Sequence, residues 1–319
     1  MSPLRQDRKA IQNILSWVFV LLAITLLTTA VANQWDEFVE AALRLSPSAI
    51  LLSAAAGLLG LITIMMAWRS ALAATSHWLP VPDTAYSYFL TQLGKYLPGA
   101  VWPIIAQMEM LRRHGVSRYQ SALGSILAII CNICTAVAVG VIAILATQQS
   151  ILDYWWLIGI AVTGTAFMLP PVLRFLLKFA SRTNHRLAPL ADIKLQGKHL
   201  FSAIIWDTAS WILFGIHFWF LASDLLEAQQ LVLLSIGAYA IAWAAGFVVI
   251  FAPAGIGVRE GVMLTLLGTL FATPNLLALV IVSRTILTIL DLVASGIGCC
   301  ANWFLTRKNK VSLSPTIKV

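Results

Sequence analysis

The chain alternates long apolar runs with short polar ones. Uninterrupted apolar segments occupy residues 14–32, 49–67, 120–146, 155–173, 201–222, 231–252 and 276–304. A helix needs about 20 apolar residues to cross the hydrocarbon core of a bilayer, whereas a transmembrane strand would show about ten residues of alternating polarity. The pattern therefore predicts an all-α polytopic membrane protein, with a single transmembrane domain over residues 1–319.

Two further apolar stretches are interrupted. Thr84–Leu111 is broken in its middle by a Pro-Gly pair, and Val258–Ala272 follows a turn rich in proline and glycine. Because a helix rises only 1.5 Å per residue, neither half of the first stretch is long enough to cross a bilayer. We expect each interrupted stretch to belong to a re-entrant hairpin. The predicted tip residues are Pro98 and Gly99 in the first hairpin, and Pro253, Gly255 and Gly257 in the second.

The composition supports lipid as the solvent of this chain. Hydrophobic residues make up 60% of it and charged residues 11%, against about 25% charged residues in a typical soluble domain. This excludes a disulfide-stabilised secreted scaffold, a nucleic-acid-binding domain and an ordinary cytoplasmic enzyme. The net charge of +8 then reports basic cytoplasmic loops and not a nucleic-acid partner.

The basic residues also predict the orientation. They gather before the first apolar segment, after the first hairpin, in the loop 174–200 and in the tail 305–319, so that both termini and this loop are expected to be cytoplasmic. Parity then requires six full crossings and two re-entrant hairpins, the second of which pairs 231–252 with 258–272. Residues 14–146 form a first half and residues 155–304 a second half that begins on the opposite face, which is an inverted repeat.

Ionisable residues inside the apolar segments are the candidates for function. Such residues are costly in a bilayer and face a cavity, a partner or a substrate. We assign substrate binding to Lys95, Arg259, Glu260, Arg284 and Asp291, and ion coupling to Asp207. For each of them, pairing between helices is the structural alternative, and for Asp207 this is a packed, hydrogen-bonded carboxyl group.

Arg259 and Glu260 follow the glycine-rich turn at the start of a new helix. Free N–H groups, the helix dipole and a cationic side chain together favour an anion there. We expect the partner of Arg259 to be Asp291, Asp207 or a lipid phosphate. Arg284 and Asp291 are seven residues apart and share one helix face. They could be bridged to each other or could pair with Glu260 and Arg259.

The remaining chemically active side chains are interpreted as structural. His217 is a lone histidine in an apolar helix, Glu109 is near the cytoplasmic surface, and Cys131 and Cys134 are expected to be buried thiols. No further ligand stands near the cysteines, so that no metal or cofactor is expected. The chain also has no nucleotide-binding loop and no hydrolase motif, which argues against an enzyme.

The two hairpin tips carry a resemblance to a known family. Gly94-Lys95-Tyr96-Leu97-Pro98-Gly99 with Trp102, and Pro253-Ala254-Gly255-Ile256-Gly257-Val258-Arg259-Glu260, resemble the two signatures of the lysylphosphatidylglycerol synthase transmembrane family. The family has glycine where this chain has Ala254. We expect a stand-alone family member without the aminoacyl-transferase domain of the full-length synthases, so that the resemblance implies no lipid aminoacylation.

The resemblance implies a flippase-like lipid translocator in the bacterial inner membrane. Its partners would be membrane lipids with a phosphate headgroup, and no nucleic acid. Two alternatives stay open, which are a membrane-embedded transferase acting on a lipid-linked glycan or phospholipid, and a structural partner in envelope synthesis. A transferase would require Asp207, Glu260 and Asp291 to converge. Homo-oligomerisation also stays open.

Overall fold

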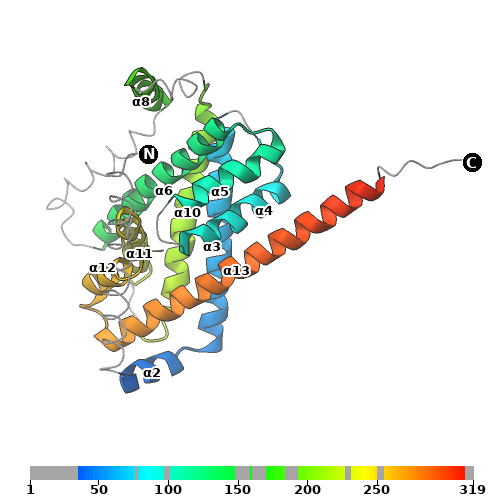
Figure 1. Ribbon diagram of the computed structural model, residues 1–319. Coiled ribbons are helices and arrows are strands. Elements are labelled where there is room, and N and C mark those ends of the chain that lie inside the picture. Colours follow the sequence, from blue (N-terminus) through cyan, green and yellow to red (C-terminus); the bar gives the residue numbers. More distant parts are fainter. Residues whose placement is uncertain are drawn as a thin grey trace, which may run out of the picture.

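The computed structural model of the chain is a bundle of helices (Figure 1). It describes residues 35–75, 78–96, 101–147, 159, 170–183, 193–226, 231–249 and 255–312, and these contain no strand. In chain order the helices are α2 (Trp35–Leu43), α3 (Pro47–Ala73), α4 (Val81–Gln92), η1 (Leu93–Tyr96), α5 (Trp102–Met110), η2 (Leu111–His114), α6 (Arg118–Leu145), α8 (Pro170–Thr183), α10 (Gly197–Ala222), α11 (Leu231–Val248), α12 (Val258–Leu267) and α13 (Thr273–Ser312). The all-α prediction is confirmed.

Five of the described helices are long and apolar enough to cross a membrane. They are α3, α6, α10, α11 and the part of α13 that ends at Asn302, which confirms a polytopic membrane protein. The predicted crossing 14–32 and most of 155–173 lie outside the described residues, as do the tip residues Pro98, Gly99 and Pro253. The count of six crossings and the inverted repeat therefore stay predictions.

The limbs of the first predicted hairpin are short helices. α4 has 12 residues and α5 has nine, which correspond to about 18 Å and 14 Å of length against a hydrocarbon core of about 30 Å. The second hairpin is different, because α11 has 18 residues and α12 has ten. By its length α11 could cross the membrane completely, although the parity argument treats it as one limb of a hairpin.

Local sequence signals account for where these helices begin. Ser46 caps α3 by accepting a hydrogen bond from the N–H of Ala49, and Pro47 occupies the first helical position, where a missing N–H does no harm. Ser117 and Gln120 form a reciprocal capping box at the start of α6, which satisfies two otherwise unpaired N–H groups.

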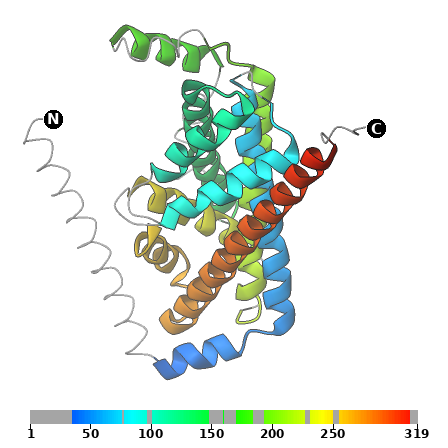
Figure 2. The ribbon, with the colours of Figure 1, turned by 45° about the vertical axis from the view of Figure 1, so that its right-hand side comes forward.

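The central helices pack through small residues. α3 and α10 run side by side through the middle of the bundle, α13 crosses it obliquely, and α2 and α8 lie at opposite ends (Figure 2). At Gly215 on α10 an added Cβ would lie 2.3 Å from Ile236 Cα on α11, so that the two backbones are in direct contact. Close approach at small residues is how helices associate in lipid, where apolar burial adds little.

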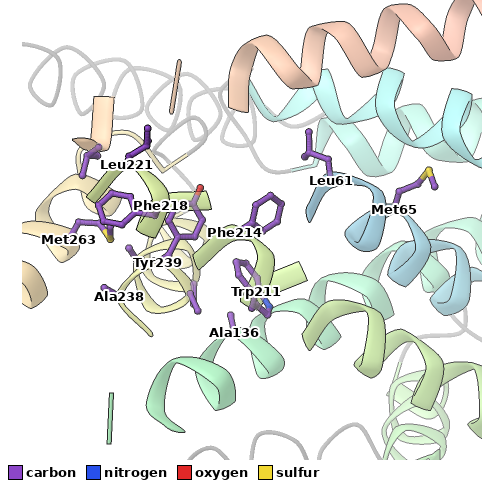
Figure 3. Close-up of a cluster of buried hydrophobic side chains, with 14 of the residues drawn as sticks. Leu61, Met65, Ala136, Trp211, Phe214, Phe218, Leu221, Ala238, Tyr239 and Met263 are labelled. Carbon is purple, nitrogen blue, oxygen red and sulfur yellow. The ribbon is translucent and has the colours of Figure 1, made fainter. Parts of the chain in front are cut away.

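An aromatic cluster and one buried histidine hold these helices together. Phe214 of α10 stacks against Tyr239 of α11 in the core (Figure 3), and Trp211 of α10 contacts Trp243 of α11. His217 is fully buried, with Nδ1 2.8 Å from the Ser53 hydroxyl of α3 and Nε2 2.8 Å from the Ser283 hydroxyl of α13. His217 thus links three helices, as its structural interpretation predicts.

Candidate functional site

A cavity of about 240 Å³ opens between the two predicted hairpins. Its wall is mostly apolar and includes side chains from α3 to α6 and from α10 to α13. The predicted site residues on this wall are Lys95, Asp207, Gly255, Arg259, Arg284 and Asp291. Residues next to both hairpin tips therefore meet at one cavity, although they are far apart in the sequence.

Asp291 joins the first hairpin to α13. Its carboxylate Oδ2 lies 2.6 Å from Lys95 Nζ and accepts a hydrogen bond of 2.7 Å from the Tyr96 hydroxyl. Asp291 is buried, whereas the Lys95 side chain is 34% exposed. The positive charge that η1 brings to the cavity is thus compensated by a carboxylate of α13.

Glu260 plays the corresponding part in the second hairpin. Its Oε2 accepts a hydrogen bond of 2.6 Å from the N–H of Gly257, and its Oε1 forms an ion pair with Arg284 Nη1. Gly257 has φ +84°, a conformation that residues with a Cβ rarely adopt. Glu260 therefore caps α12 and holds Arg284, which is one of the two pairings that the sequence left open.

Arg259 has a different environment from the one predicted. Its aliphatic stem passes between Gly246 and Gly255, where added Cβ atoms would lie 2.5 Å from Arg259 Cγ and 2.9 Å from Cδ. Its guanidinium carbon lies 5.4 Å from the centre of the Tyr239 ring, a cation–π distance.

The expectation that Asp291 or Asp207 neutralises Arg259 is wrong. Asp291 binds Lys95, and Asp207 binds an amide on α6. Within the part of the chain that the structure describes, no carboxylate and no hydrogen-bond acceptor contacts the Arg259 guanidinium. The two glycines and the aromatic ring thus hold a cation whose hydrogen-bond donors are available to a ligand.

Asp207 lies on the wall of the same cavity. Its Oδ1 accepts a hydrogen bond of 2.9 Å from Asn132 Nδ2, and both side chains are buried. Asp207 Oδ2 and Asn132 Oδ1 are also buried, and neither has a hydrogen-bond partner among the described residues. The packed carboxyl group that the sequence allowed is present, but it is only half satisfied.

A family comparison bears on this cavity. The model of the lysylphosphatidylglycerol synthase TM region matches residues 13–295. The chain belongs to this family. The match includes both predicted hairpins and every charged residue of the cavity wall. No curated protein matches the chain. Family membership and the five candidate spans make it a multi-pass membrane protein tied to lipid or envelope handling.

In this family member, sequence reasoning missed several polar residues of the cavity wall, among them Gln107, Asn132 and Tyr239. Gln107 is buried on α5, and its Oε1 accepts hydrogen bonds from Trp68 Nε1 at 3.2 Å and Ser125 Oγ at 2.5 Å. A search for charged residues passes over amides and phenols, although an amide in an apolar run also needs buried partners.

The other singled-out side chains lie away from the cavity. Glu109 is exposed and binds Arg118 at 3.1 Å and Arg112 at 3.0 Å. The hydrogen bond from Arg118 and, to a lesser extent, the charge of Arg112 lower the pKa of the Glu109 carboxyl group. Cys131 is buried and Cys134 partly so. Among the described residues, no group of three His, Cys, Asp or Glu side chains could hold a metal ion.

Proposed function

We propose that this protein translocates a phosphate-bearing lipid, with the headgroup passing through the cavity between the two hairpins. The observation that carries the proposal is the state of Arg259. Lys95 and Arg284 are already paired with carboxylates. The Arg259 guanidinium instead contacts an aromatic ring, and its N–H groups make no hydrogen bond within the described residues. A guanidinium fork matches the oxygens of a phosphate, and the start of α12 adds a positive dipole end.

The size of the cavity agrees with a headgroup as its occupant. At about 240 Å³ it lies below the range of about 300–1,000 Å³ that is typical of pockets for drug-sized ligands. Acyl chains would therefore stay in the bilayer while the headgroup enters. Alternating access in transporters takes place around such a midplane site, by movement of one repeat against the other.

The alternative of a membrane-embedded transferase is less well supported. Such an enzyme needs carboxyl groups that are free to exchange protons with a substrate. Asp291 and Glu260 each hold a cation in an ion pair. Among the charged residues of the described cavity wall, Asp207 is then the one carboxyl group outside an ion pair, so that an acid/base pair is incomplete. The basic loops favour cytoplasmic termini, and we propose that the translocator lies in the inner membrane.

The test is translocation by the purified full chain in vesicles. A phosphatidylglycerol with a fluorescent short acyl chain is placed in both leaflets, and a membrane-impermeant quencher reports its exposure over time. We expect Arg259→Ala to lose most of the activity and Arg259→Lys to be impaired, because lysine lacks the planar fork. Arg113→Ala is the matched control, since it removes one positive charge from an exposed position on η2.

Two outcomes would overturn the proposal. One is normal transport by Arg259→Ala. The other is equal transport of a neutral glycosyl lipid, which has a polar headgroup of similar bulk but no phosphate. A thermal unfolding curve of each variant separates lost transport from lost folding, because a purely structural role of Arg259 would lower both in parallel.

A further inference from the structure

The buried pair of Asp207 and Asn132 contains two oxygen atoms, Asp207 Oδ2 and Asn132 Oδ1, to which no group in the described residues donates a hydrogen bond. One hydrogen bond, from Asn132 Nδ2 to Asp207 Oδ1, holds the amide against the carboxyl group. The second oxygen of each group has no hydrogen-bond partner within the part of the chain that the structure describes. Burying an unpartnered polar atom is unfavourable, and burying an unpaired charge is much more so. Such groups in a native structure call for an explanation.

A proton can provide the missing hydrogen bond between these two oxygens better than any larger ligand. Both unpartnered oxygens are buried, so that an ammonium group or a hydrated ion could reach them only after the helices moved apart. A proton needs no volume. On Asp207 Oδ2 it would convert one acceptor into a donor directed at the amide oxygen, and an acid and an amide would then form two parallel hydrogen bonds.

The charges of the cavity connect this proton to the proposed ligand. Arg284 is balanced by Glu260 and Lys95 by Asp291. If Asp207 is ionised, the three cations and three carboxylates sum to no net charge, although Asp207 makes no contact with Arg259. If Asp207 is protonated, one positive charge is in excess and an anion is favoured.

Resting on the function proposed above, we propose that Asp207 binds a proton and that this proton and the anionic headgroup reinforce each other's binding. By thermodynamic linkage the effect is reciprocal. The headgroup raises the occupancy of the proton, and the proton raises the affinity for the headgroup. A proton gradient could then bias the direction of transport.

The experiment must distinguish Asp207 from the other titratable groups near the pair. α3 and α5 place none on the cavity wall, and on α6 the Cys131 thiol lies next to Asn132 in the sequence. The titratable side chains of the wall other than Asp207 are Tyr88 on α4, Lys95 and Tyr96 on η1, Tyr239 on α11, Arg259 on α12, and Arg284 and Asp291 on α13. Of these, Asp291 is the other carboxyl group, which makes variants at Asp207 the deciding ones.

The first measurement needs no lipid. Infrared difference spectra of the full chain, recorded between pH 5 and 9, report a protonated carboxyl group by its carbonyl band. We expect a band that shifts on labelling with ¹³C-aspartate and is absent from Asp207→Asn. The isotope shift identifies an aspartate even if the variant fails to fold. Absence of an aspartate band over the whole range would overturn the proposal, whatever the protein transports.

The second measurement tests the linkage with short-chain phosphatidylglycerol, a phosphodiester that stays singly charged over this pH range. We expect the affinity of the wild type to fall about tenfold from pH 5 to 9, which is the effect of one charge at roughly 10 Å with an effective dielectric constant of about 20. Asp207→Asn should bind with the affinity of the acid form at every pH and take up no proton on binding.

The controls separate this inference from the proposed function. Glu109→Gln removes an exposed carboxylate that lies off the cavity wall and should keep the pH dependence of the wild type. Binding that is independent of pH in the wild type would refute the linkage but leave translocation standing. No binding at any pH, with the aspartate band present, would refute the function and leave the proton site.

Discussion

The ion pair between Glu260 and Arg284 offers a sharp test of how the second hairpin is held. The Glu260 side chain is 4% exposed and makes two contacts, one with Arg284 and one with the N–H of Gly257. Removing one partner of a buried ion pair typically destabilises by about 3–5 kcal/mol. Since Arg284 is 23% exposed, we take the lower end, about 3 kcal/mol. Loss of the helix cap adds about 1 kcal/mol.

We therefore expect Glu260→Ala to lower the free energy of unfolding by about 4 kcal/mol. Glu260→Gln keeps an oxygen for the cap and should lower it by about 3 kcal/mol. At about 2 °C per kcal/mol for a chain of this size, the midpoints fall by about 8 °C and 6 °C. The assay is thermal unfolding of the purified chain, followed by tryptophan fluorescence.

The exposed carboxylate of Glu109 is the matched control. It also contacts arginine side chains, but it is 63% exposed, so that Glu109→Ala should not move the midpoint measurably. In a double-mutant cycle with Arg284→Ala, the loss for Glu260→Ala should be partly non-additive, because Arg284→Ala has already removed the ion pair that Glu260→Ala breaks. Equal melting midpoints for Glu260→Ala and Glu109→Ala would refute this account of the hairpin. So would strictly additive losses of stability in the double-mutant cycle.

Three further outcomes follow from the packing and the topology. Gly246→Ala places a Cβ 2.5 Å from Arg259 Cγ and should destabilise by about 1–3 kcal/mol while reducing translocation. Gly261→Ala, with open space around its Cβ, should change neither. His217→Phe leaves two buried serine hydroxyls without their partner and should lower the melting midpoint without altering the headgroup preference of the residual transport. Arg182→Cys should react with an impermeant thiol reagent from the cytoplasmic side alone, and labelling from the periplasm would contradict the proposed orientation.

Much of the fold follows from the sequence because hydrophobicity over about 20 residues is a local property. The apolar runs 49–67, 120–146 and 201–222 correspond to α3, α6 and α10, and the break after Lys95 separates α4 from α5. Boundaries were less well predicted. α13 runs from Thr273 to Ser312, beyond both ends of the predicted segment 276–304, because polar residues at helix ends can continue a helix outside the hydrocarbon.

The site was predictable in its members but not in its pairings. Charged residues in an apolar run can be recognised from the sequence as candidates for a site, because their burial needs a partner or a cavity. This reasoning found Lys95 and Asp291 but could not join them, because the partner of a buried charge depends on how each helix is rotated and how deep it lies. Those two quantities are set by packing between helices that are distant in the sequence.

The sequence by itself thus determined that this is a helical membrane protein with two interrupted segments and with charged residues next to each break. This was possible because the free energy of moving a segment into lipid is roughly the sum of contributions from its individual side chains. The tertiary structure alone decided that Asp291 compensates Lys95, that Glu260 holds Arg284, and that Arg259 stands between two glycines over an aromatic ring. It also brought Asn132 to Asp207. An amide on α6 and a carboxyl group on α10 become a pair only when the helices that carry them are packed.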